Sequence, residues 1–446
     1  MLFNSYSFIF YFLIPVVLVY RLIPETFKLW YLIFVSIIFY AQWNIVHLFI
    51  LASSILVNYL FAYFISIRRR IPTRGIPTVL LFLVIGLNIG LLGYFKYSGF
   101  LNLSDGSMVL PLAISFFTFQ QIAYIVDIYR GKIALESFDR YLFFVMFFPQ
   151  LVAGPIVHYN YIMRQVDGGR LGARSGFGAG VLLFSMGLFS KVVIADNLIR
   201  ESYNSWSDIF SYSFMIYFDF SGYANMAIGL ALMFGILLPI NFDSPYKATN
   251  LIEFWRKWHI TLSDFLKNYI YIPFGGSRFG KKRQVVALMS TMVIGGIWHG
   301  AGWNFLLWGA MHGVGLVVVH LWVSFSSSRP NLIWERVRFF SGVIFTFLYV
   351  TLLWVLFFSN NIEEAFRVYQ TLFSFDKFGL KGFDVFWLLG CAIIVWGMPN
   401  SIEFLDIKKR DLGVKYWYAY LSAFLLFVSL KVMAESPSIN FVYFNF

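Results

Sequence analysis

Histidine is the residue type in this chain whose chemistry suits proton transfer, because the imidazole changes its charge near neutral pH. Six histidines occur among the 446 residues. His299 lies in the string GGIWHGAGWN, whose glycines allow another backbone or a ligand to approach closely. His259 and His312 lie in the strings FWRKWHITLS and WGAMHG. A buried neutral imidazole at such a place could remove a proton from a substrate hydroxyl or thiol, as a general base does.

The spacing of these residues leaves two interpretations open. On an unbroken helix, Trp303 would stack on His299 at i+4. His312 follows 13 residues after His299 and would lie about 220° further around the same helix. The two imidazoles therefore share a face only if Gly300 and Gly302 break the helix. Histidines among aromatic residues are also typical of a packed core, so a structural role stays open for each.

No other arrangement of catalytic residue types competes with the histidines. The single cysteine, Cys391, excludes an internal disulfide, a CxxC redox pair and a cysteine-based zinc site. The chain contains no HExxH, no GxSxG and no P-loop motif. We therefore expect no metal site and no permanently bound cofactor.

Carboxylates within apolar runs are costly and are candidates for function. Asp219 has no basic residue nearby in sequence and needs a partner from elsewhere in the fold, so structure and function stay equally open for it. Asp196 is expected to pair locally, with Lys191 close by in sequence. Asp127 is expected to form a structural ion pair.

The composition identifies the environment of these side chains as a membrane. Of all residues, 59% are hydrophobic and only 13% are charged, which excludes a soluble enzyme, a disordered chain and a nucleic-acid-binding protein. The net charge of +12 is then interpreted as the excess of Lys and Arg in cytoplasmic loops. Basic residues follow the odd-numbered apolar runs, which predicts an N-terminus outside the cytoplasm.

The apolar runs predict an all-α polytopic membrane protein with about 11 crossings and one or two re-entrant segments, forming one domain over residues 1–446. Leu142–Val157 contains two prolines around Gly154, which favours a helix that enters the membrane and turns back. No internal repeat suggests a two-fold transporter.

The segment Lys247–Phe274 differs from the rest because it mixes charge with aromatic residues at helical spacing. We expect one interfacial helix there, with its polar face at the lipid headgroups. Its basic residues Arg256 and Lys257, and those of the following predicted cytoplasmic loop, would suit the phosphates of a donor. The loop residues concerned are Lys281, Lys282 and Arg283.

Several strings in this order resemble one known family. They are LPLAISFFTFQ, YIVDIYRG, FFPQLVAGPI, GLFSKVVIADN, YFDFSGY, NFDSPYK, FWRKWHITLS and WHGAGWNF with WGAMHG, spread over about residues 110–313. Together they are similar to the membrane-bound O-acyltransferases (MBOAT), in particular the membrane subunits of bacterial alginate O-acetyltransferases.

The resemblance implies a helical bundle around a funnel or tunnel, with His299 catalytic and His259 in the same tunnel. His312 matches a recurring position but is expected to pack. We expect Trp298, Trp303 and Asn304 to shape the cavity, with Asn304 donating to an oxyanion. Asp219 and Trp258 are further candidates for the tunnel wall.

The implied reaction moves an acyl group, most simply acetyl, from a cytoplasmic thioester such as acetyl-CoA across the bacterial inner membrane. The acceptor would be an exported polysaccharide or a periplasmic acetyltransferase partner. Alginate, cellulose and peptidoglycan all stay open as the polymer.

Three alternatives stay open. The first is D-alanyl transfer to teichoic acid from a carrier protein, on the same fold. The second is a transporter or flippase that uses Asp127 and Asp219, which predicts paired repeats. The third is a structural subunit, which would tolerate alanine at every histidine.

Overall fold

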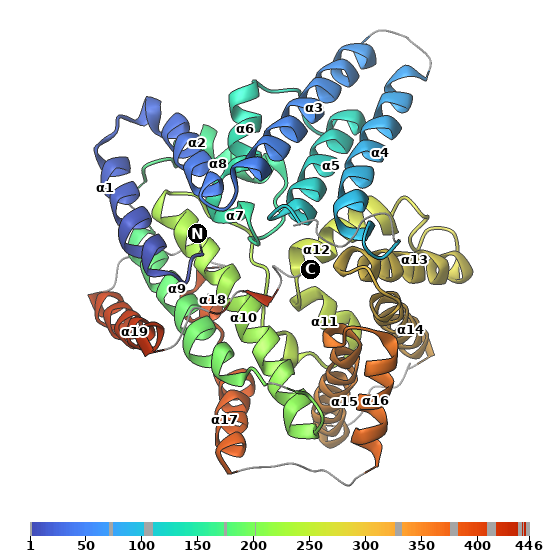
Figure 1. Ribbon diagram of the computed structural model, residues 1–446. Helices are drawn as coiled ribbons and strands as arrows, with labels where there is room; N and C mark the ends of the chain where they lie inside the picture. Colours follow the sequence, from blue (N-terminus) through green and yellow to red (C-terminus); the bar gives the residue numbers. More distant parts are fainter. Residues whose placement is uncertain are drawn as a thin grey trace. The chain divides into compact units, whose positions relative to one another are not determined.

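A computed structural model describes residues 2–70, 75–101, 110–173, 176–200, 202–325, 332–374, 382–407, 416–435, 439 and 441–442. Within these ranges the chain forms helices joined by short turns, with no strand (Figure 1). Helices satisfy all backbone hydrogen-bonding groups within one segment, which an apolar chain in lipid requires. The predicted all-α fold is confirmed.

The chain divides into two compact units, and each is built from several stretches of sequence. Unit 1 contains residues 1–189, 222–239 and 411–445, and unit 2 contains residues 190–221 and 240–410. The backbone passes from one unit to the other within helix α10 (Trp206–Met233), at Ser221 and Gly222. A boundary of this kind leaves no linker signal in the sequence.

Unit 1 holds the N-terminal helices and the last helix of the chain. Its helices are α1 (Ile14–Leu22), α2 (Glu25–Ala41), α3 (Ile45–Arg70), α4 (Ile76–Tyr97), α5 (Ile114–Arg130), α6 (Phe138–Met146), α7 (Phe148–Leu151), α8 (Tyr159–Asp167), α9 (Phe177–Phe189) and α19 (Tyr416–Glu435), with the π-helical turn η1 (Ser7–Leu13) before α1. Within this unit α19 packs along α9, and α3, α4 and α5 contact one another (Figure 1).

Unit 2 holds the three histidines singled out above. Its helices are α11 (Leu251–Lys257), α12 (Ile260–Leu266), α13 (Lys281–His299), α14 (Trp303–Phe325), α15 (Leu332–Phe358), α16 (Ile362–Phe373), α17 (Gly382–Ala392) and α18 (Ser401–Phe404), with the short π- or 3-10-helical segments η2 (Ser190–Ala195), η3 (Asp196–Leu198), η4 (Pro245–Lys247), η5 (Lys267–Tyr271) and η6 (Ile393–Gly397).

By length and composition, six of the described helices could cross a membrane. They are Ile45–Arg69, Ile76–Tyr97, Phe177–Leu198, Trp303–Val323, Glu335–Phe358 and Tyr416–Glu435. Each overlaps one of the apolar runs that predicted the crossings, which are His47–Ser66, Thr78–Phe95, Phe177–Ala195, Phe305–Trp322, Phe340–Phe357 and Ala419–Val432. The described residues also include two shorter apolar helical stretches, Ser7–Leu22 and Val385–Gly397, which match two further predicted spans.

The break expected within Leu142–Val157 is confirmed. Helix α6 ends at Met146, α7 is a single turn, and α8 begins only at Tyr159. A Cβ on Gly154 would lie 2.5 Å from the Cα of Gln150, so this turn requires glycine. The Nε2 of Gln120 donates to the carbonyl of Phe144 at 2.9 Å, which satisfies a backbone group near the break.

The single interfacial helix expected over Lys247–Phe274 is wrong. The segment contains α11 and α12, and the break between them lies at Trp258 and His259. His259 adopts a left-handed backbone conformation with φ of 43°, which ends the helical hydrogen-bond pattern. The aromatic residues Phe254, Trp258 and Phe265 are buried, because the two short helices pack them into the core.

Helices α13 and α14 form an antiparallel hairpin whose contact consists of glycines. A Cβ on Gly296 would lie 2.3 Å from the carbonyl oxygen of Phe305, and one on Gly309 would lie 2.4 Å from that of Met292. Further from the turn, Gly313 faces Met289. Small residues at such positions let two helix backbones approach closely within a membrane.

This contact predicts a stability effect for Gly296→Ala. The new methyl group must push α14 away from α13, and overpacking of this kind costs about 1–3 kcal/mol. The temperature at which the purified protein ceases to be monodisperse should therefore be lower for the variant than for the wild type. Gly86→Ala in α4 is the matched control, since a Cβ there meets nothing within 4 Å. Equal thermal stability of the two variants would contradict the close packing.

Candidate active site

His299 is the last residue of α13, where the chain leaves the helix. Gly300 is extended, with φ of −163° and ψ of 158°, and α14 begins at Trp303. A Cβ on Gly300 would lie 2.1 Å from the ring of Phe305, so the tight turn depends on glycine. The helix is therefore broken between His299 and His312. This is the condition under which their two imidazoles can share a face.

Aromatic rings surround the imidazole of His299. The centroids of the Trp298, Trp308 and Phe357 rings lie 4.7, 5.1 and 5.2 Å from its own, each in an edge-to-face orientation. The residue is 3% exposed. Phe357 comes from α15, so three helices contribute to the enclosure of one imidazole.

His312 lies on the other side of Trp308. The two ring centroids are 4.6 Å apart, and His312 is fully buried. The indole Nε1 of Trp255 donates to Nδ1 of His312 at 3.3 Å. Because an indole can only donate, the proton of neutral His312 must be on Nε2, and this buried atom has no hydrogen-bond partner among the described residues.

His259 is fully buried, and its orientation is set by Asn241. The carbonyl oxygen of the Asn241 side chain accepts from the hydroxyl of Thr261 at 2.9 Å and lies 3.1 Å from Nδ1 of His259. Since this oxygen can only accept, Nδ1 carries the proton and Nε2 is the unprotonated nitrogen. Burial lowers the pKa of His259 to about 3, so the imidazole is neutral at physiological pH.

Tryptophans connect the three histidines. Trp298 has its ring 6.3 Å from that of His259 and 4.7 Å from that of His299. Trp308 contacts His299 and His312 in the same way. The order is therefore His259, Trp298, His299, Trp308 and His312, and all belong to unit 2. We call this series the histidine–tryptophan cluster.

Two predicted tryptophans lie elsewhere. Trp258 is buried and stacks on Phe254 at 5.6 Å and against Trp354 at 5.0 Å, so it belongs to the core behind the cluster. Trp303 is 64% exposed, and the break at Gly300 removes the i+4 relation that the predicted stacking on His299 required. The condition for stacking of Trp303 on His299, an unbroken helix, is therefore not met.

The side-chain amide of Asn304, which was predicted to donate to an oxyanion, donates to backbone carbonyls in this structure. Its Nδ2 donates to the carbonyl oxygens of Leu356 and Ser359 at 3.1 and 2.8 Å. Both amide protons are thus used at the end of α15, where helix carbonyls lack partners within the helix. The side chain ties the start of α14 to α15 beside Phe357.

The partner that Asp219 needs is Lys191. The Nζ of Lys191 lies 2.7 Å from a carboxylate oxygen of Asp219 and 2.6 Å from one of Asp196. The Lys191 and Asp219 side chains are 2% and 1% exposed. The expected pairing of Asp196 with Lys191 is confirmed. Phe220, next to Asp219, packs its ring 4.8 Å from that of His259, so the ion pair lies near the cluster.

Three of the basic residues assigned to the donor lie far from His299 along the same helix. Lys281, Lys282 and Arg283 are exposed and form the first turn of α13, not a loop as predicted. His299 ends the same helix, so about 24 Å of helix separates it from Arg283. Arg256 is exposed, and Lys257 pairs with Glu253 at 2.7 Å.

The sequence prediction missed three residues of the site. Trp308 and His312 are four residues apart on one helix, a spacing that could have identified Trp308. Asn241 lies in the string NFDSPYK, but nothing in its spacing indicates a contact with His259. Phe357 has no recognisable signal. Among the described residues, no group of three His, Cys, Asp or Glu side chains could hold a metal ion.

The chain is similar to proteins of one family. A sequence model described as "MBOAT, membrane-bound O-acyltransferase family" matches residues 200–359. The peptidoglycan O-acetyltransferase of Helicobacter pylori is 40% identical over 439 residues, covering 85% of this chain and 81% of the relative. The probable alginate O-acetylase of Pseudomonas aeruginosa is 35% identical, covering 85% and 76%. The teichoic acid D-alanyltransferase of Streptococcus thermophilus is 27% identical, covering 49% and 58%.

The buried ion pair predicts a large effect for Lys191→Met. Removing the ammonium leaves the buried carboxylate of Asp219 without its counter-ion, which costs about 3–5 kcal/mol. Thermal unfolding of the purified protein should shift down strongly, and the double variant K191M/D219N should recover part of the loss. Lys257→Met is the control, because its pair with Glu253 is partly exposed and contributes less than about 1 kcal/mol. Equal shifts in K191M and K257M would contradict a buried pair.

Proposed function

The chain belongs to the membrane-bound O-acyltransferase family, and from its site we infer the reaction of this O-acyltransferase. It transfers an acetyl group from a thioester donor on the cytoplasmic side to an acceptor outside, for O-acetylation of an exported polysaccharide. The observation that supports this most is the enclosure of His299 by Trp298, Trp308 and Phe357 at the break between α13 and α14.

His299 is the general base of this proposal. An imidazole buried among aromatic rings is held in the neutral form that accepts a proton. The acceptor hydroxyl attacks the thioester carbonyl carbon while His299 takes its proton. The carbon–sulfur bond then breaks, and the imidazolium returns the proton to the departing thiolate. An ester and a free thiol result.

His259 and His312 act beside this base in different ways. Asn241 holds His259 with Nε2 unprotonated, so this atom can accept a hydrogen bond from the donor or acceptor on its way to His299. His312 is a positioning residue, because it acts on His299 only through Trp308. The hydrogen bond from Trp255 fixes the imidazole of His312, and this imidazole packs against the indole of Trp308.

The donor is a soluble acyl thioester whose phosphates bind the exposed basic residues at the start of α13. Lys281, Lys282 and Arg283 stand at a helix N-terminus, where backbone N–H groups add to the attraction for anions. From there the acyl group travels along α13 toward His299. This route requires a donor with a long arm, as acetyl-CoA has.

The acceptor belongs to a polysaccharide pathway of the cell envelope. A peptidoglycan O-acetyltransferase and a probable alginate O-acetylase each align with 85% of this chain, which supports a glycan as the final acceptor. A periplasmic acetyltransferase that receives the acetyl group first is the proposed partner. The proposed location is the bacterial inner membrane, with the N-terminus outside.

Two other functions have less support. The teichoic acid D-alanyltransferase covers only 49% of this chain, against 85% for the O-acetylating relatives. A transporter would use Asp219 as a binding charge, but this carboxylate is already paired with Lys191.

Replacing the proposed base predicts loss of activity without loss of fold. His299→Ala should lower acetylation of the extracellular glycan by about 10²–10⁴-fold, since general-base catalysis contributes that much. The measurement is the acetate released from the glycan by alkali, per amount of membrane protein. His320→Ala is the control, because this residue bonds only to the carbonyl of Leu316 in its own helix. Full acetylation by H299A with normal thermal stability would refute the assignment.

Removing the basic turn predicts an effect on donor binding alone. The triple variant K281Q/K282Q/R283Q should raise the KM for acetyl-CoA several-fold and leave kcat unchanged, because these side chains lie far from His299. Added salt should raise the wild-type KM in the same direction. The control is the triple variant R164Q/R367Q/K431Q, which loses the same charge at exposed positions elsewhere. If both triple variants have the same KM, the donor binds at another place.

A further inference from the structure

A groove of about 1130 Å³ lies beside α14 and α15, apart from the rings that enclose His299. One wall is formed by the α14 residues Val314 and Val318, and the other by the α15 residues Phe345 and Tyr349. The start of α11, from Thr249 to Leu251, completes the lining. All of these residues belong to unit 2.

Glycines shape the floor of this groove. A Cβ on Gly315 would lie 2.4 Å from Leu251, and a Cβ on Gly342 would lie 2.6 Å from the carbonyl oxygen of Thr249. The backbones of both long helices therefore approach the start of α11 at these two points. The hydroxyl of Tyr349 also donates to the carbonyl of Met311 at 2.7 Å. The groove is thus a built feature with fixed walls.

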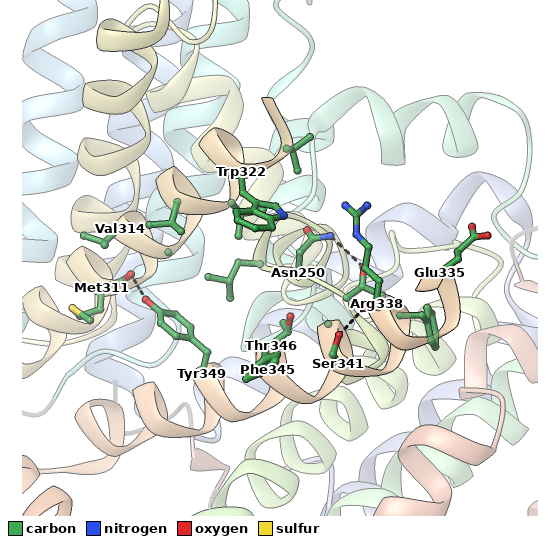
Figure 2. Close-up of a pocket in the computed structure, with 18 residues that line it drawn as sticks. Asn250, Met311, Val314, Trp322, Glu335, Arg338, Ser341, Phe345, Thr346 and Tyr349 are labelled. Carbon is green, nitrogen blue, oxygen red and sulfur yellow. Dashed lines mark hydrogen bonds between the residues drawn. The ribbon is translucent and has the colours of Figure 1, made fainter. Parts of the chain in front are cut away.

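The two ends of the groove differ in chemistry. Figure 2 shows Arg338 and Glu335 toward one end and Met311, Val314 and Tyr349 toward the other, with Trp322 between them in this view. Trp322 is near the end of α14, and Glu335 and Arg338 are near the start of α15. Tryptophan and charged residues at the ends of spans mark the level of the lipid headgroups.

In a membrane, the remaining length of the groove would face hydrocarbon. Both α14 and α15 are long and apolar enough to cross a membrane. Val318 and Phe345 are 57% and 72% exposed although they line the groove. An occupant must therefore present apolar chains along the helices and a polar group at the level of Arg338.

We propose that this groove binds one phospholipid with a phosphoethanolamine headgroup. Its phosphate contacts the guanidinium of Arg338, its ammonium contacts the carboxylate of Glu335, and an acyl chain lies between Val318 and Phe345. The pairing of one cation with one anion, three residues apart on α15, matches a zwitterion. A purely anionic headgroup would satisfy Arg338 but meet the like charge of Glu335.

A bound lipid would act on the start of α11, which forms the floor of the groove. One turn after Leu251, the same short helix presents Trp255 to His312. The lipid would therefore stabilise the packing of α11 against α14, and its binding should raise the thermal stability of the protein.

The test uses the full-length protein, delipidated in detergent and analysed by native mass spectrometry with added phosphatidylethanolamine or phosphatidylglycerol. We expect one molecule of phosphatidylethanolamine to bind with preference over phosphatidylglycerol and to raise the unfolding temperature. Arg338→Gln should weaken the binding of both lipids about fivefold. Glu335→Gln should remove the preference by weakening phosphatidylethanolamine alone. Val318→Trp, which fills the groove, should weaken both lipids.

Controls on the same helix separate this site from general lipid contact. Arg336→Gln and Val337→Trp change exposed neighbours that do not line the groove, and both should bind as the wild type does. Equal binding of the two lipids by the wild type would overturn the proposal. So would unchanged binding in V318W or R338Q, or a dimer that forms through the groove in place of lipid binding. None of these readouts depends on the acyl-transfer reaction.

Discussion

The close approach of α13 and α14 is the constraint on which the rest of the site depends. Gly296 and Gly309 bring the two backbones within a distance that no side chain would allow. Because of this contact, His299 at the end of one helix faces Trp308 on the other. A wider hairpin would separate them, and Phe357 could then no longer complete the enclosure. The glycines of this contact thus set the distance between the two helices, and that distance sets the position of the His299 imidazole.

Ring contacts define the cluster. Edge-to-face contacts orient the imidazole of His299. Hydrogen bonds orient the two outer histidines, from Trp255 to His312 and between Asn241 and His259. The charged group of Lys191, Asp196 and Asp219 is separate from the cluster, and Lys191 pairs with both carboxylates. This separation lets a membrane protein hold three histidines without burying an isolated ion.

The sequence predicted the apolar helices and identified His299 as a candidate, because periodicity and local motifs are short-range signals. It also predicted that His299 and His312 share a face only if Gly300 and Gly302 break the helix, and the structure contains such a break at Gly300. The pairing of Lys191 with Asp219 could not be predicted, since it joins residues 28 positions apart in sequence. The amide of Asn304 was assigned to chemistry because its neighbour in space, the end of α15, lies more than 50 residues away. The break at His259 depends on Asn241 and was missed for the same reason.

The tryptophans that separate the histidines have a consequence for spectroscopy. An indole next to an imidazole fluoresces less when the imidazole gains a proton, and its emission shifts when water or a ligand enters its surroundings. Trp298 and Trp308 touch His299 from two sides and are 6% and 1% exposed. The emission of these two indoles should therefore respond to a change in the charge of the His299 imidazole or to a molecule that enters beside it. Variants that keep only one of the two indoles would separate the response on one side of the ring from that on the other.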